Sequence, residues 1–292
     1  MKFFVFVCSI LLLVSCEKNI DFNLHEAEKF LVVDASIENN MPPIVVLTNS
    51  FDYYAKIDPQ LLAGAFIHDA EVSISDGTQT HKLKEYFIDS IGGIRLFYYS
   101  IDTTNGATQL TGQFNTFYKL TINSQGKEYT AITTIPELAK KPDSLWWKPA
   151  PFNTDTNNVG VMVKAIDPPG LGNYVLYFTK KNSGPFLPGE NSVYDDQVID
   201  GSTYEIRVDP GIDRNNKISF DKNYFRRGDT VTLKLCNIDK VTYKFWLTME
   251  FAYQSIGNPF ASPNKVLGNI SNGALGAFTG YAAFYKTIIV PQ

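Results

Sequence analysis

Few residues in this sequence could perform acid–base or nucleophilic chemistry. The 292-residue chain holds three histidines (His25, His68 and His81) and three cysteines. Ser-His-Asp or Cys-His catalysis needs an imidazole beside a nucleophile. The sequence contains no Gly-x-Ser-x-Gly elbow, His-Glu-x-x-His helix or phosphate-cradling glycine loop. It therefore favours a protein that is not an enzyme and that carries no cofactor.

Carboxylates form the densest group of candidate ligand atoms. They gather between residues 195 and 221, as Asp195, Asp196, Asp200, Asp209, Asp213 and Asp221, with Asn215 among them. Asp209, Asp213 and Asn215 supply hard oxygen donors, which calcium prefers. The segment lacks the EF-hand spacing, and Arg214 lies among the donors. Solvated turn residues are therefore the favoured interpretation, with a weak calcium site and a hydrolase site as alternatives.

Aromatic and apolar residues supply candidate contact surfaces. Adjacent residues of a strand point to opposite faces, so one of Trp146 and Trp147 is expected in a core. The other could seal a joint between domains or bind a flat ligand. Phe186, Leu187 and Tyr194 lie in a long predicted connection over residues 182–200, and Phe260 in another over 258–276. Long connections are often functional, so these residues form the candidate ligand or partner surface.

The N-terminus predicts export. Lys2 precedes an apolar run over residues 3–14, and roughly 12 residues fit a signal peptide better than a membrane span of about 20. The run ends in Leu13-Val14-Ser15-Cys16, which resembles the bacterial lipobox. We expect residues 1–15 to be removed and Cys16 to carry lipid, which anchors the chain stably to a membrane. A plain signal peptide with an incidental cysteine is the alternative.

Loss of the leader leaves Cys236 as the one cysteine besides Cys16. An internal disulfide is then impossible when Cys16 is acylated. Cys236 lies in an alternating strand pattern, so we expect a small buried apolar residue there and not a nucleophile.

Composition points to a mostly β chain. Aromatic residues make up 14% of the sequence, and aromatic and β-branched residues favour sheets. The net charge of −4 argues against nucleic acid as a partner. Residues 16–28 are polar and suit a lipidated tether. About seven short strands punctuated by turns over residues 29–136 predict an N-terminal immunoglobulin-like β-sandwich.

A second β-rich domain is predicted over residues 145–292, after a linker at 137–144 that directly follows Pro136 and contains Pro142. One segment of this domain has a helical period. Asp239 is a candidate N-cap, and apolar residues then recur every three or four positions up to Ile256. We therefore expect one amphipathic helix near 239–256 covering a sheet face.

Several segments, taken in order, resemble the Bacteroidetes lipoprotein family of domain of unknown function 4249. They are the lipobox with Cys16-Glu17-Lys18, Leu31-Val32-Val33-Asp34-Ala35, Ala70-Glu71-Val72-Ser73-Ile74 with Asp76-Gly77, Tyr118-Lys119-Leu120-Thr121-Ile122, Gly126–Ala131 with Thr133–Pro136, Asp143-Ser144-Leu145, and Asn258-Pro259-Phe260 with Asn269-Ile270. The resemblance implies accessory lipoproteins of the outer membrane that associate with TonB-dependent transporters, with no established catalytic residues. Residues 269–276 depart from the family's tighter glycine-rich form.

We therefore expect a lipid-anchored, non-enzymatic accessory or ligand-capture subunit that works with a TonB-dependent outer-membrane transporter. A structural or adhesive surface protein is the main alternative, and it predicts no small-molecule pocket. Glu17 and Asp21 near Cys16 give a thin acidic signal that favours the cell surface over the periplasm. The ligand stays open at this point.

Overall fold

The computed structural model describes residues 28–51, 58–89, 93–104, 106, 109–151, 153–214, 224–256, 258, 260 and 264–292. The predicted leader, the lipidation site Cys16, nearly all of the tether and the calcium candidate Asn215 lie outside these residues. Strands dominate the described chain, so the prediction of a mostly β fold is confirmed.

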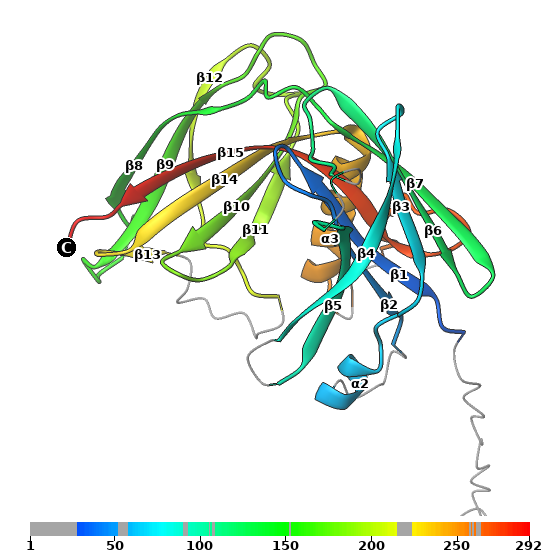
Figure 1. Cartoon of the computed structure of the whole chain (residues 1–292). Coiled ribbons are helices and arrows are strands. Elements are labelled where there is room, and N and C mark those ends of the chain that lie inside the picture. The colour runs from blue at the N-terminus through cyan, green and yellow to red at the C-terminus, as the bar shows by residue number, and fades with distance from the viewer. Residues whose placement is uncertain are drawn as a thin grey trace, which may run out of the picture.

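The elements follow one another as in Figure 1. In the first half they are β1 (Leu31–Glu38), β2 (Ile44–Asn49), α2 (Pro59–Ala63), β3 (Glu71–Ser75), β4 (Thr80–Asp89), β5 (Arg95–Ile101), β6 (Thr116–Ser124) and β7 (Lys127–Ile135). In the second half they are β8 (Pro142–Pro149), β9 (Asn158–Ile166), β10 (Tyr174–Lys181), β11 (Phe186–Tyr194), β12 (Thr203–Val208), β13 (Phe225–Arg226), β14 (Thr230–Ile238), α3 (Lys240–Gln254) and β15 (Leu275–Ile289).

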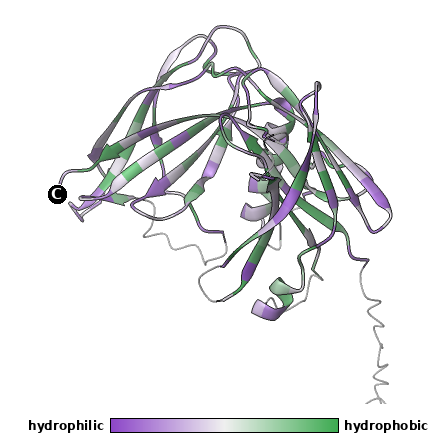
Figure 2. Cartoon of the chain, in the orientation of Figure 1, coloured by the Kyte–Doolittle hydropathy of each residue, from purple (hydrophilic) through white to green (hydrophobic). Residues whose placement is uncertain are grey.

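The first half folds as a sandwich around one core. The sheet order here is β15-β1-β2-β5-β4-β3-β6-β7. β4 pairs with β3 over its first residues and with β5 over the rest, so it passes between the two layers. Alternate residues of these strands meet in the core, such as Ile37, Val45, Ile74 and Leu120. This alternation is visible as changing colour along the strands in Figure 2.

The second half forms a further pair of layers. One layer is β11-β10-β14-β15, and the other is built on β9, which pairs with β8, β12 and β13. Their shared core includes Val161 of β9, Tyr177 of β10, Leu233 of β14 and Phe225 of β13. The two halves lie on opposite sides of Figure 1, with β15 running between them.

β15 belongs to both halves. Leu275–Tyr281 pairs in parallel with β1, and the following Ala282–Ile289 pairs antiparallel with β14. Phe278 lies in the first core, while Val290, just past the strand, lies in the second. The first sandwich therefore takes a strand from the range predicted to form the second domain. Nor is the 137–144 segment an exposed connection, because Lys140 is fully buried and β8 begins at Pro142.

The predicted amphipathic helix is confirmed as α3. Asp239 caps it by accepting a hydrogen bond from the Thr242 N–H at 2.7 Å. The second carboxylate oxygen of Asp239 accepts from the Thr134 N–H of β7 at 3.0 Å, which ties the helix start to the first sandwich. Tyr243 and Trp246 pack with buried Cys236 and other residues on the outer face of the β10–β14–β15 layer.

Candidate ligand cavity

A cavity of about 410 Å³ opens between the two layers of the second half. A volume of this size falls in the range of small-molecule sites, about 300–1,000 Å³. Its walls come from β9, β10, β12 and β14, from the last residues of β11 and from the segment that follows β11. Most of the lining is aliphatic, with Val163, Ala165, Val175, Val193, Val198, Ile199, Ile206, Val208, Leu233 and Leu235.

Strand alternation places these side chains. Successive residues of a strand face opposite ways, so Val163 and Ala165 of β9 face inward together, as do Leu233 and Leu235 of β14. On β12 the exposed fraction rises from 2% at Val208 to 36% at Ile206. The cavity lining is therefore more enclosed at Val208 than at Ile206.

Four tyrosines give the cavity its polar groups: Tyr177, Tyr194, Tyr204 and Tyr243. The rings of Tyr177 and Tyr194 are nearly parallel, with centroids 6.4 Å apart. Burial raises the pKa of Tyr194, Tyr204 and Tyr243 to about 12 each. Their hydroxyls therefore stay neutral at physiological pH. Tyr194 donates its hydroxyl proton to the Asn191 carbonyl oxygen at 2.8 Å and Tyr243 donates to Asp195, so both hydroxyl oxygens can accept a hydrogen bond from a ligand.

Asp195 and Arg207 are the charged residues among the described lining. The Arg207 Nε donates to Asp209 at 2.9 Å, and its guanidinium lies over the ring of Tyr224. Asp195 accepts a hydrogen bond from the Tyr243 hydroxyl at 3.2 Å. In the part of the chain that the structure describes, no lysine or arginine forms an ion pair with Asp195.

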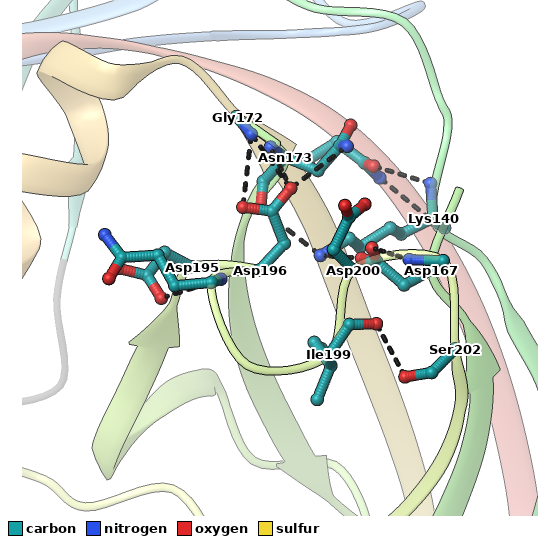
Figure 3. Close-up of polar contacts among 12 residues, drawn as sticks. Lys140, Asp167, Gly172, Asn173, Asp195, Asp196, Ile199, Asp200 and Ser202 are labelled. Atoms are coloured by element: carbon teal, nitrogen blue, oxygen red, sulfur yellow. Dashed lines mark hydrogen bonds and ion pairs between the residues drawn. The ribbon is translucent and has the colours of Figure 1, made fainter. Parts of the chain in front are cut away.

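The segment between β11 and β12, residues 195–202, forms one rim of the cavity. Hydrogen bonds join it to residues 167–173, and we call this set of contacts the clasp (Figure 3). Asp196 accepts hydrogen bonds from the backbone N–H groups of Gly172 at 2.9 Å and Asn173 at 2.8 Å. Asp200 accepts from the Gly170 N–H at 2.7 Å. The clasp fixes the base of the segment and leaves Val198 95% exposed at the mouth.

Electrostatics fits this structural role of Asp196. Burial raises the pKa of its carboxyl, but the hydrogen bonds from the Asn173 and Gly172 N–H groups together outweigh burial and hold the pKa below its ordinary value. The N–H groups of residues 172 and 173, including the Asn173 side-chain amide at 3.2 Å, thus keep the carboxylate ionised, and the clasp persists at neutral pH.

Asp167, Asp196 and Asp200 lie close enough to hold a metal, with carboxylate oxygens within 4.8 Å of one another. A cation is already present, because the Lys140 ammonium contacts Asp167 and donates to the Asn173 carbonyl oxygen at 3.2 Å. Asp196 and Asp200 already accept hydrogen bonds from backbone N–H groups. The donor set therefore suits a lysine-centred clasp better than a metal centre.

Of the weak calcium candidates, Asp209 and Asp213 lie in the part of the chain that the structure describes. Asp209 pairs with Arg207, and the cluster of metal-binding dimensions found among the described residues contains neither Asp209 nor Asp213. Asn215 lies outside the described residues.

Of the residues predicted from sequence as a ligand or partner surface, Tyr194 lines the cavity. Phe186 and Leu187 do not. They lie in β11, a strand paired with β10, where a connection was predicted. Pro188, Gly189 and the register shift opposite Leu176–Phe178 make that strand irregular, which hides its alternation in the sequence. Phe186 packs on Tyr285 instead, with ring centroids 5.6 Å apart.

The tryptophans and Phe260 also lie away from the described lining. Trp147 packs against the core of the second half with the Arg227 guanidinium 4.7 Å from its ring centroid, and Trp146 has Lys148 over its ring. Phe260 is 94% exposed. Sequence reasoning missed Ala165, Tyr177 and Tyr204. The sequence signal that could have found them is the alternating pattern of β9, β10 and β12, which places Ala165, Tyr177 and Tyr204 at inward positions.

The arrangement defines a class: a β protein of two sandwiches joined by a shared strand, with an apolar, tyrosine-bordered cavity in the second. The family model described as domain of unknown function (DUF4249) matches residues 17–287, so the chain belongs to that family, as the resemblance predicted. A comparison with curated proteins gave no match. None of the described helices has the length and apolar character needed to span a membrane.

Proposed function

We propose that this chain is a ligand-capture protein that binds a small, mostly apolar molecule in the cavity of its second half. The observation that carries the proposal is the cavity itself, which combines an aliphatic lining with a few hydrogen-bonding groups. Such a combination is the usual design of small-molecule sites, where apolar walls supply affinity and polar groups fix orientation.

The chemistry of the lining favours capture over catalysis. General acid–base catalysis works best with groups whose pKa lies near the working pH. Burial moves the tyrosine pKa values the other way, so these hydroxyls stay protonated and are weak general acids. The cavity also favours capture over the structural or adhesive alternative, because a spacer module needs no internal space for a small molecule.

We further propose that lipid on Cys16 anchors the protein to the outer membrane and that it works there with a TonB-dependent transporter. The support is the Leu13-Val14-Ser15-Cys16 motif, which resembles a lipobox, and the resemblance of the chain to the lipoprotein family described above. A protein tethered beside a transporter raises the local concentration of whatever it captures. The acidic residues after Cys16 favour the cell-surface side.

Co-purification tests this function. The tagged, lipidated protein is isolated from native membranes in mild detergent, and both proteins and organic-extractable small molecules are identified by mass spectrometry. We expect a TonB-dependent transporter at near-equal amount together with a small apolar molecule. The Cys16→Ala variant serves as control and should lose both membrane association and transporter. Recovery of the lipoprotein with neither transporter nor small molecule would contradict the proposal.

A further inference from the structure

We propose that the captured molecule is an amphiphile with a cationic amine head, bound with its head at Asp195 and its apolar body between β9, β10, β12 and β14. The inference rests on the proposed capture function and adds the chemical class of the ligand. Three features of the cavity support it: the separation of its polar and apolar lining residues, the ion pairing of the carboxylates around it and the position of its tyrosines.

Polarity is divided along the cavity. Its inner part is walled by buried aliphatic residues such as Val163, Val208 and Leu233, which offer no hydrogen-bonding side chains. The carboxylate of Asp195 stands on the segment 195–202 that borders the opening. A molecule that fills this space must therefore be apolar along its body and polar at one end, because an unpaired polar group in the inner part would cost free energy.

Carboxylate pairing then decides the charge of that polar end. Asp209 is paired with Arg207 at 2.9 Å, Glu250 with Arg214 at 3.7 Å, and Asp167 with the buried Lys140. These three carboxylates thus each have their own cation, while Asp196 and Asp200 are held by hydrogen bonds from N–H groups of residues 170–173. Asp195 receives the Tyr243 hydroxyl and a longer contact from the Gln197 N–H at 3.4 Å, both of which are neutral donors. A ligand ammonium would supply the cation that Asp195 lacks.

The tyrosines suit the same head group. Aromatic rings attract cations through their faces, and ammonium ligands are commonly held by several rings beside a carboxylate. After burial, the influences that raise the pKa of these hydroxyls are nearby carboxylates: Glu250 and Asp209 for Tyr194, Asp195 for Tyr243 and Asp167 for Tyr204. Of these carboxylates, Asp195 is the one without a lysine or arginine partner among the described residues, and it lies beside the Tyr243 hydroxyl. An anionic head would meet Asp195 directly, while Arg207 is already engaged by Asp209.

Matched single-chain probes test the inference. Binding of decylammonium and decanoate to the purified protein is measured by calorimetry below their micelle concentrations, in the wild type and in Asp195→Asn. Asparagine keeps the shape and still accepts the Tyr243 hydroxyl, so only the charge is removed. We expect decylammonium to bind roughly tenfold or more tightly than decanoate in the wild type, with the preference falling to about threefold or less in Asp195→Asn.

Glu205→Gln is the control, because it removes one negative charge from an exposed position of β12 that does not line the cavity. It should leave the wild-type preference unchanged. Equal or tighter binding of decanoate by the wild type would overturn the cationic head while leaving capture of apolar molecules in place. Binding of neither probe would overturn both. The wild-type preference is informative by itself should Asp195→Asn fail to fold.

Discussion

At the scale of single residues, the ion pair of Lys140 with Asp167 is the most consequential contact near the cavity. Both side chains are fully buried. The Lys140 backbone N–H also donates to the Asn237 side chain at 2.7 Å, and the Asn237 amide donates back to the Lys140 carbonyl oxygen at 2.8 Å. Asp167 in turn accepts from the Gly201 N–H at 3.2 Å. The pair thus joins the start of the second half to the segment that borders the cavity.

Removal of the lysine alone should destabilise the fold strongly. Lys140→Met leaves the Asp167 carboxylate buried without a cation, so we expect the free energy of unfolding to fall by about 3–5 kcal/mol, measured by urea denaturation. Adding Asp167→Asn removes the uncompensated charge and should restore most of the loss.

The exposed pair Lys82–Glu71, at 3.5 Å with both side chains about 70% exposed, is the matched control. Lys82→Met should change stability by about 1 kcal/mol or less. Similar losses from Lys140→Met and Lys82→Met would contradict a structural role of the buried pair.

Lys140 also shows why residue-level prediction fails here. The run Ala139-Lys140-Lys141-Pro142 has the composition of an exposed linker, and lysine is among the residues least often buried. Its burial depends on Asp167 and Asn237, which are distant in sequence and are brought to it by the fold. Tyr194 was found from sequence because it is a large, partly apolar residue in the long predicted connection over residues 182–200, which is a local signal.

At the scale of elements, β15 couples the two halves. Its first part completes the first sandwich beside β1, and its second part lies beside β14. Unfolding either half therefore leaves one stretch of this strand without its paired neighbour. An edge of this length left unpaired would be costly and prone to aggregation.

The shared strand predicts a single unfolding transition. The three tryptophans, Trp146, Trp147 and Trp246, all lie in the second half, so their fluorescence reports that half alone. Far-ultraviolet circular dichroism reports strands of both halves. We expect the two urea unfolding curves to coincide, as they do for one cooperative unit. A fluorescence midpoint clearly separated from the dichroism midpoint would show that the halves unfold independently.

Elements were predicted unevenly from sequence, for physical reasons. α3 follows from a capping aspartate and a 3.6-residue period, which are both local signals. The parallel pairing of β1 with β15 joins residues that are more than 200 positions apart, as in Val33 with Gly276, and no local pattern specifies it. The division at residues 137–144 came from local turn signals, which do not report that a later strand returns to the first half.

At the scale of the whole molecule, two sandwiches share one strand, and the second holds an open apolar cavity bordered by a clasped segment. The family resemblance covers nearly the whole chain and is confirmed over residues 17–287. It indicates the class of the protein, whereas the cavity emerges only when β9, β10, β12 and β14 are packed together. Its volume depends on which inward positions hold small side chains, such as Ala165, and on how far apart the layers stand.

The central claim is that this cavity holds the captured molecule, and filling it is the most direct test. Ala165 is buried on β9 with its side chain lining the cavity, so Ala165→Phe places a ring in the space that the ligand would occupy. Lys164→Phe adds the same ring at the next position, which faces the opposite side of the strand. Both proteins and the wild type are purified from native membranes, and their organic extracts are compared by mass spectrometry. We expect a small apolar molecule from the wild type and from Lys164→Phe and its loss from a folded Ala165→Phe. The same molecule recovered in equal amount from all three would contradict it.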